Sequence, residues 1–451
     1  MREGQGIVTV SGGLPERLQK IHMKIWIVAT LGFLFEGLDL TIVGGILAVL
    51  TRQFHMSSAT TGLLGSTALA GYVVGVALAG WLGDKYGRKF VMQYTLLTFT
   101  ISSVVAAISW NSVSFGVLRF ITGIGVGGES AIVTPYLAEL MPIRFRGRLL
   151  GISDAFFTVG AIIASLINLV VIPASINGWR IALVIAGIPA LYVWVIRKGL
   201  PESPRWLAIH NKTSAAKEIY ERIGVHDMPP FSKMSTSNFQ RSARTSSLAE
   251  IWSKPLAGKT ALLWITWFFI ELVYYGFLIW IPSLLIKHGL TIVKSLEYSF
   301  LMNIAALAGG IIASVIQDTR WGRKLTIVLF FFLSGISSYL FSIAKADWAI
   351  LLSGCILSFL LNGLFSMLYT FTPEQYPTET RATGQGFASA FGHIGGTIGP
   401  LIVGLTLASL GVGGVFTIFA GMLIVPMIAV SFLSEMRNKA VYDTLDTSSQ
   451  G

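Results

Sequence analysis

The chain has 451 residues, of which 53% are hydrophobic and 12% are charged, about half the charged share of an ordinary soluble domain. This composition excludes a set of polar-surfaced soluble domains and predicts a membrane protein with several spans. A single cysteine, Cys355, excludes an intramolecular disulfide and a Cys-x-x-Cys metal or redox site. The formal net charge of +11 would suit nucleic acid, but the basic residues gather in turns and tails, so we expect no nucleic-acid partner.

Twelve apolar stretches, each long enough to cross a bilayer as a helix, follow one another along the chain. They cover residues 26–50, 60–82, 90–109, 113–138, 148–173, 180–199, 260–286, 295–316, 325–344, 348–372, 383–408 and 412–433. With both termini in the cytoplasm, the opposite side holds only five of the 33 Lys and Arg residues: Arg52, Arg180, Lys287, Lys294 and Lys345. This asymmetry satisfies the positive-inside rule. The predicted fold is all-α and integral to the membrane, with twelve transmembrane helices.

The first span contains two carboxylates, Glu36 and Asp39, inside its apolar run. A charge at that depth costs roughly 2.5–3.5 kcal/mol on insertion scales, so it normally faces a cavity, a partner or a proton path. The i, i+3 spacing places both side chains on one helix face. We interpret the pair as functional; the alternative is a buried pair that only packs against a neighbouring helix.

The fourth span contains Gly123, Gly125 and Gly128, which match the Gly-x-Gly-x-x-Gly pattern of dinucleotide sites. No strand precedes these glycines and an apolar helix surrounds them, which disfavours a nucleotide site. We expect them to let the fourth helix pack tightly against its neighbours.

A polar stretch, residues 200–258, separates two sets of six spans and is predicted to be a cytoplasmic linker. At an offset of 235 residues, Glu36, Gly87, Arg88, Glu139 and Arg146 recur as Glu271, Gly322, Arg323, Glu374 and Arg381. This is a parallel repeat, which predicts two six-helix bundles that rock against each other around one site. The predicted domains are residues 1–199, the linker, and residues 259–451 with a short cytoplasmic tail.

Several segments resemble those of the major facilitator superfamily. Residues 80–89 resemble its signature loop, residues 318–324 are a degenerate second copy, and residues 119–129 and 201–207 resemble sugar porters and related metabolite–proton symporters. Gly80 and Gly83 are expected to permit close helix approach. The resemblance implies the fold of that superfamily and a cytoplasmic gate built from Gly80, Asp84, Gly87, Arg88, Glu139, Arg146, Asp318, Arg323, Glu374 and Arg381.

The seventh span narrows the substrate. Sugar porters carry a Gln-Gln-x-x-Gly-x-Asn pattern there, whereas residues 267–276 of this chain contain no amide side chain. The second half resembles bacterial nicotinate (niacin) transporters most closely, through residues 274–276, 280–283, 297–298, 372–378 and 381–384. Two residues depart from that pattern: His393 stands where arginine is expected, and Glu271 where an apolar residue is expected.

Depth along the helices places a set of polar and aromatic residues near the middle of spans one, four, five, seven and eleven. The candidate substrate-binding residues are Glu129, Asp154, Phe156, Glu271, Tyr274, Tyr275, Phe391 and His393. Asp39 and Arg119 match the carboxylate–arginine pair that couples proton movement in sugar porters, so the resemblance implies that Asp39 carries the proton and Arg119 is its partner. Glu36 is a second proton candidate. A static salt bridge, and a packing role for His393, are the alternatives.

We therefore predict a proton-coupled symporter for a small aromatic or other monocarboxylate, with nicotinate as the example. Five acids (Glu36, Asp39, Glu129, Asp154 and Glu271) face only Arg119 and His393, so an organic-cation/proton exchanger stays an alternative, as does a porter for sugars or polyols. With no nucleophile–base set and no Walker loop, we expect no enzyme activity and no cofactor, the proton gradient being the energy source. We expect a functional monomer in the plasma (cell inner) membrane.

Overall fold

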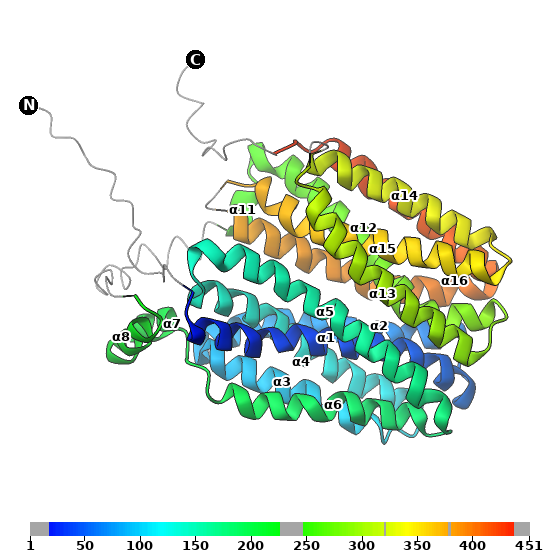
Figure 1. Cartoon of the computed structure of the whole chain (residues 1–451), viewed down its shortest axis with the longest axis horizontal. Helices are drawn as coiled ribbons and strands as arrows, with labels where there is room; N and C mark the ends of the chain where they lie inside the picture. The colour runs from blue at the N-terminus through cyan, green and yellow to red at the C-terminus, as the bar shows by residue number, and fades with distance from the viewer. Residues whose placement is uncertain (1–17, 226–246, 320–321, 378–379, 437–451) are drawn as a thin grey trace, which may run out of the picture.

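The computed structural model describes residues 18–225, 247–319, 322–377 and 380–436. Within these ranges the regular elements are helices (Figure 1). The long ones are α1 (Lys20–Gln53), α2 (Ser58–Tyr86), α3 (Arg88–Ala106), α4 (Ser112–Leu140), α5 (Ile143–Val171), α6 (Gly178–Arg197), α12 (Lys254–Lys287), α13 (Ile292–Ile316), α14 (Arg323–Ile343), α15 (Asp347–Glu374) and α16 (Arg381–Ser431). The short ones are α7 (Pro204–Ile209), α8 (Thr213–Arg222) and α11 (Ser247–Ile251), with a 3₁₀ turn at Ile172–Ala174.

Eleven of the described helices are long and apolar enough to cross a membrane, where the sequence predicts twelve spans. The difference lies in α16, which contains the last two predicted spans without an intervening loop. An unbroken helix of that length would measure about 75 Å, more than twice the hydrocarbon thickness. Gly411 interrupts it with a φ of +65°, a conformation that glycine adopts without a steric penalty. The chain therefore turns back at Gly411.

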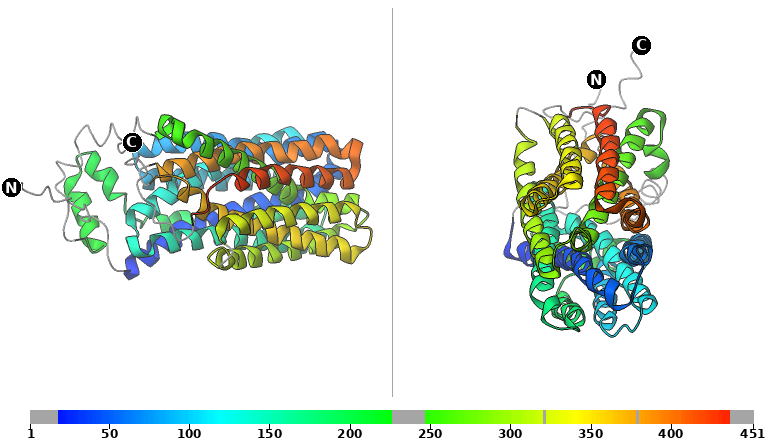
Figure 2. Two further views of the ribbon diagram at one scale, coloured as in Figure 1. Left: turned by 90° about the horizontal axis from the view of Figure 1, so that it is seen from above. Right: turned by 90° about the vertical axis from the view of Figure 1, so that its right-hand side faces the viewer.

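The long helices form two bundles that lie side by side, α1–α6 in one and α12–α16 in the other (Figures 1 and 2). The short helices α7 and α8 project beyond one end of the first bundle. We call that end of the molecule the linker end, and the opposite end the far end. α1, α3, α5, α12, α14 and α16 begin at the linker end.

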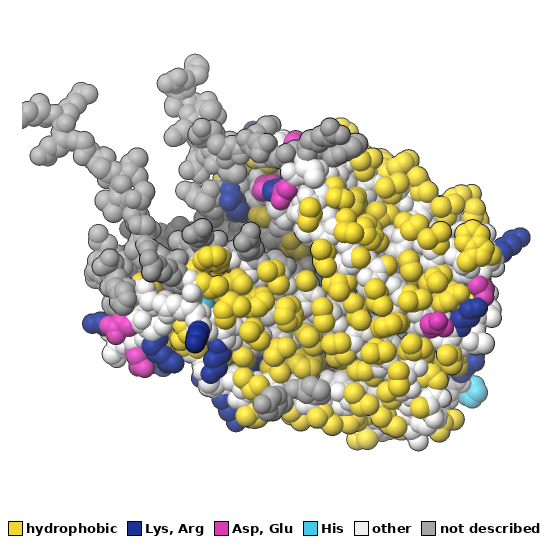
Figure 3. Space-filling view, viewed as in Figure 1, with side chains coloured by type: hydrophobic (Ala, Val, Ile, Leu, Met, Phe, Trp, Pro, Cys, Tyr) yellow, Lys and Arg dark blue, Asp and Glu magenta, His cyan; other side chains and the backbone are white. Residues whose placement is uncertain are grey.

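The sides of the bundles are apolar. Figure 3 shows hydrophobic side chains over the broad face, with charged side chains gathered toward the two ends. Ile312, Val315 and Phe332 are 42%, 66% and 52% exposed. Apolar surface of that extent is rare on a soluble monomer, and it matches the acyl chains of a bilayer in both position and chemistry.

Glycines bring helix backbones into contact, as predicted for the fourth span. A Cβ added at Gly123 of α4 would lie 1.9 Å from the carbonyl oxygen of Ala68 in α2. At the far end a close glycine contact also joins the two bundles. A Cβ at Gly62 of α2 would lie 2.7 Å from the Pro400 carbonyl oxygen and 2.9 Å from Cα of Gly404, both in α16. The halves therefore meet backbone to backbone at the far end.

Candidate functional site

A buried ion pair joins α1 to α4. Arg119 donates through Nη1 to Oδ1 of Asp39 at 2.8 Å and through Nη2 to Oδ2 at 2.5 Å. Ser103 of α3 donates to Oδ1 at 3.1 Å. Asp39 is 1% exposed and Arg119 is fully buried, and a two-point pair of this kind fixes the orientation of both side chains. The structure thus brings together the two residues that sequence analysis paired.

A second buried ion pair changes the interpretation of Glu129. Oε1 of Glu129 lies 2.5 Å from Nη1 of Arg197 in α6, and Thr95 of α3 donates to Oε2 at 3.1 Å. Arg197 also donates to the Ala29 carbonyl oxygen of α1 at 3.0 Å. These contacts tie four helices of one bundle together. Glu129, predicted to bind substrate, is instead occupied by Arg197, which sequence analysis missed because it stands among the basic residues that end the sixth span.

The two bundles meet in a flat ring stack. The imidazole of His393 in α16 lies parallel to the ring of Tyr72 in α2, with centroids 4.2 Å apart and an interplanar angle of 1°. Tyr275 of α12 lies 6.2 Å from the same imidazole at an angle of 47°. All three side chains are buried. Sequence analysis missed Tyr72, although an aromatic residue in the middle of a span of small residues was an available signal.

Two carboxylates lie near this stack, one from each bundle. Oε1 of Glu271 is 3.3 Å from Nδ1 of His393, and the same nitrogen is 2.9 Å from the Ser389 carbonyl oxygen. Because the Ser389 carbonyl oxygen can only accept a hydrogen bond, that contact requires a proton on Nδ1. Oε2 of Glu271 is enclosed and has no hydrogen-bond partner among the described residues. Glu36 of α1 is close enough for its charge to act on Glu271 and Tyr72.

Tyr274 continues the aromatic wall. Its ring is T-shaped against Tyr275, at 5.3 Å between centroids, and against Phe365 of α15, at 4.8 Å. A cavity of about 20 Å³ lies beside Tyr274 and is also lined by Asn303 and Ser358. That volume holds no more than a water molecule, so the cavity is no substrate chamber.

Two predicted site residues pack elsewhere. Phe391 stacks on Trp264 at 4.7 Å and lies 5.7 Å from Phe268, in an aromatic cluster with α12. Phe156 is T-shaped against Trp26 of α1 at 5.8 Å. Both rings are engaged in helix packing, and that they line the site stays a prediction. The side chain of Asp154 lies outside the described part of the structure, as does that of Arg146.

At the linker end, the first half holds its predicted gate residues in contact with the linker. Arg88 pairs with Asp84 at 3.0 Å. Glu202, just after α6, accepts from the backbone N–H of Arg88 at 2.9 Å and so caps α3, which begins after Gly87 at a φ of +103°. Glu139 accepts from the hydroxyl of Ser203. Gly80 has open space where a Cβ would stand, so it allows no close helix approach, contrary to prediction, whereas Gly83 faces Ile132 at 2.7 Å.

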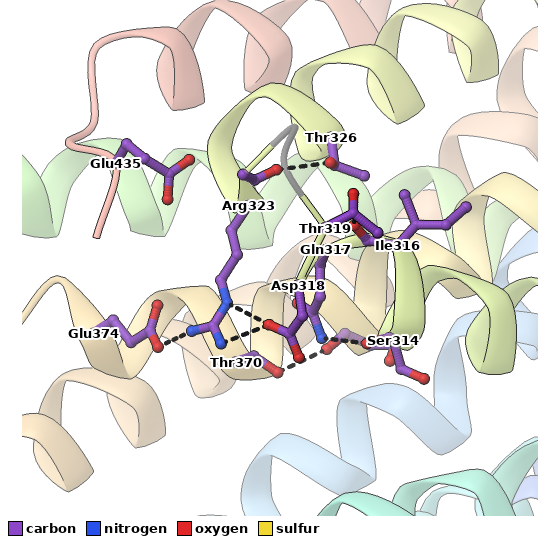
Figure 4. A network of polar contacts seen from close by, with 12 residues as sticks. Ser314, Ile316, Gln317, Asp318, Thr319, Arg323, Thr326, Thr370, Glu374 and Glu435 are labelled. Carbon is purple, nitrogen blue, oxygen red and sulfur yellow. Dashed lines mark hydrogen bonds and ion pairs between the residues drawn. The ribbon is translucent and has the colours of Figure 1, made fainter. Parts of the chain in front are cut away.

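The second half repeats this arrangement. Arg323 pairs with Asp318 at 2.9 Å and also with Glu374 of α15 (Figure 4). Glu435, just after α16, accepts from the backbone N–H of Lys324 at 2.8 Å and caps α14, which begins after Gly322 at a φ of +77°. The two halves therefore share the capping device as well as the signature residues.

Comparison with known proteins identifies the family. Residues 25–440 match the family model described as sugar (and other) transporter. The chain is 35% identical to the niacin transporter NiaP of Acinetobacter baylyi, covering 92% of this chain and 94% of the relative, and 34% identical to a putative niacin/nicotinamide transporter NiaP of Bacillus subtilis, covering 86% and 88%.

Among solved structures, the xylose transporter XylE of E. coli in a partially occluded inward-open conformation superposes with a TM-score of 0.78, at 20% identity, over 94% of this chain and 100% of that one. The likeness concerns the fold, including the pairing of two helical bundles. With its residues 25–440 matched, this chain is a multi-pass membrane protein that belongs to the sugar (and other) transporter family of the major facilitator superfamily.

Proposed function

We propose that this protein is a proton-coupled symporter that carries a small aromatic monocarboxylate, such as nicotinate, across the plasma membrane by alternating access. It works as a monomer of twelve transmembrane helices with both termini in the cytoplasm, and it needs the proton gradient but no cofactor. In this proposal the linker end is cytoplasmic. The observation that carries the proposal is the stack of His393 on Tyr72 where the two bundles meet.

The stack is a site for a flat ring. Tyr72 belongs to one bundle and His393 to the other, so their separation changes when the bundles rock. At 4.2 Å the rings touch each other, and a third ring between them would require about twice that spacing. The substrate ring therefore displaces the imidazole or enters when the bundles part. Its carboxylate then lies beside the imidazole of His393.

The balance of charge also favours an acid over an organic cation. Of the five acids predicted to face the site, Asp39 is neutralised by Arg119 and Glu129 by Arg197. Among those four side chains no net negative charge remains. The argument for a cation substrate then rests on the remaining three acids, Glu36, Asp154 and Glu271, and each of these carboxyls that is protonated weakens it.

Asp39 is the proposed proton carrier. In the described state Arg119 holds both of its oxygens, which ties α1 to α4. Protonation removes the charge that attracts Arg119 and releases α1 from α4. The proton thus couples to helix motion without touching the substrate, which explains how the coupling pair can stand apart from the ring stack.

The test is transport by purified protein in liposomes with an imposed pH gradient. We expect labelled nicotinate to accumulate when the outside is acid, and unlabelled benzoate to block it. A quaternary ammonium compound should have no effect. Export of the ammonium driven by the gradient, without nicotinate uptake, would replace the proposal with organic-cation exchange.

A further inference from the structure

Arg381, the first residue of α16, has side-chain donor groups that bind nothing among the described residues. Its Nε and Nη2 atoms are enclosed, and neither has a hydrogen-bond partner among the described residues. These two nitrogens carry the parallel N–H bonds on one side of a guanidinium, the fork that a carboxylate occupies with both oxygens. Leaving enclosed charged donors unsatisfied is costly. The two parallel N–H bonds match the two oxygens of a carboxylate.

Gln385 supplies a second observation at the same place. It lies one turn further along α16, and both its amide nitrogen and its amide oxygen are enclosed without a hydrogen-bond partner in the described ranges. At 3.6 residues per turn the two side chains leave the helix about 40° apart, on one side of it. The amide adds a neutral donor beside the guanidinium fork.

The nearest gate acid along the chain, Glu374, is engaged by Arg323. Glu374 lies seven residues before Arg381, and in Figure 4 its carboxylate points to Arg323, with which it forms an ion pair. Arg323 also holds Asp318 at 2.9 Å. Arg323 therefore holds Asp318 and Oε1 of Glu374, while Oε2 of Glu374 is enclosed without a hydrogen-bond partner among the described residues. No ion pair among the described residues includes Arg381.

The position of Arg381 relates it to the ring stack. His393 is twelve residues further along α16, about 18 Å toward the far end and about 120° around the helix. An anion that leaves His393 toward the linker end passes this stretch of α16 before it reaches water. The enclosure of Nε and Nη2 argues against a lipid headgroup, which would need an approach open to the bilayer surface.

We propose that Arg381 and Gln385 form a second carboxylate site between the ring stack and the linker end, which receives the substrate's carboxylate on the cytoplasmic side of the transport path. This inference rests on the proposed function for the identity of the substrate. It makes transport asymmetric: the site is met last by a molecule that enters the cell and first by one that leaves.

Membrane vesicles of the two orientations test the site. In inverted vesicles, which expose the linker end, Arg381→Gln should raise the half-saturation concentration for nicotinate about tenfold, the loss expected for a two-point charged hydrogen bond. In right-side-out vesicles the value should change little. Arg381→Lys, which keeps the charge but not the fork, and Gln385→Leu should each give a smaller rise in inverted vesicles only. Arg222→Gln, which removes an exposed charge from α8, is the matched control and should change neither value.

Three outcomes would overturn the second site. No change in inverted vesicles for a folded Arg381→Gln protein would show that nothing binds there. An equal rise in both orientations would indicate a structural role. A rise on one side with a matching fall on the other would indicate that Arg381 sets the balance between inward and outward conformations.

A binding measurement separates this inference from the proposed function. The probe is benzoate, and the readout is its effect on the melting temperature of solubilised protein. If the second site exists, benzoate should still stabilise a Tyr72→Leu variant, which lacks the ring stack, and should not stabilise Tyr72→Leu combined with Arg381→Gln. If benzoate stabilises Tyr72→Leu but the wild-type protein transports no nicotinate, the second site is supported and the proposed function is wrong. Absence of stabilisation in Tyr72→Leu would overturn the site.

Discussion

The two halves share a repeat but hold their charges differently. Asp39, Arg119, Glu129 and Arg197 form two buried pairs in the first half, and at the offset of 235 residues the second half has Tyr274, Gly354, Leu364 and Phe432. Both ion pairs are therefore replaced by neutral side chains. Conversely, His393 corresponds to Thr158 in the first half. One ancestral bundle has been specialised in two directions.

The difference separates two tasks. The first half contains carboxylate–guanidinium pairs inside its spans, while the second half contributes rings and an imidazole to the junction. Glu36 and Glu271 are the exception, because each half has one of these two acids and they stand at matching positions of the repeat. Substitutions in one half at a time test this division of tasks.

The largest effect is expected at the first pair. Asp39→Asn should abolish accumulation driven by the pH gradient, because the amide cannot carry the proton, while counterflow exchange of labelled for unlabelled nicotinate continues. Uptake by the variant should no longer rise as the outside is acidified. Asp347→Asn, an exposed acid paired with Lys294, is the control. Loss of exchange together with uptake, in folded protein, would assign Asp39 to substrate binding or structure.

The second pair should govern stability. Arg197→Met leaves the Glu129 carboxylate buried without its cation, and removal of one partner of a buried pair costs about 3–5 kcal/mol. Thermal unfolding of the solubilised protein should move to clearly lower temperature. Arg197→Met combined with Glu129→Leu should recover most of the loss, since apolar replacement of both partners is often neutral. A double variant as unstable as the single one would mean that Arg197 acts through its contacts with α1 instead.

The ring stack should govern affinity. Tyr72→Leu removes the aromatic face contributed by the first half and should raise the half-saturation concentration for nicotinate about tenfold, from lost stacking and contact area. Tyr72→Phe keeps the ring and should stay near the wild-type value. Gradient-driven coupling, measured as the accumulation ratio at saturating substrate, should be unchanged in both. If Tyr72→Phe were as impaired as Tyr72→Leu, the hydroxyl rather than the ring would be the contact.

The smallest effect is expected at Glu271. If its carboxylate repels the substrate, Glu271→Gln should leave nicotinate affinity unchanged or improve it by about threefold, since the charge is removed at nearly constant shape. Competition binding with labelled nicotinate measures this directly. A large loss of affinity would show that Glu271 orients His393, with which it lies in contact. A charged residue of the second half would then take part in substrate binding.

The sequence predicts the positions of the helices well, but it predicts poorly which side of each helix packs against which neighbour. Apolar runs fix the spans, because membrane thickness sets their length, and the one difference in number comes from the turn at Gly411, which needs no loop. Asp39 and Arg119 were matched through a resemblance, not through spacing. Glu129 and Arg197 lie 68 residues apart on different helices, and no local pattern reports which way such side chains point. Tyr72 was missed for the same reason, since its partner His393 belongs to the other bundle.

The cap on α14 limits how the chain can be shortened or tagged. Glu435 lies just after the last long helix, yet its carboxylate binds the start of a helix more than a hundred residues earlier, at Lys324. A fluorescent fusion or a truncation placed right after Ser431 would remove that carboxylate and leave the α14 amides without their acceptor. Tags for purification or imaging therefore belong beyond Glu435, and a deletion series across that position should show an abrupt drop in yield when it is crossed.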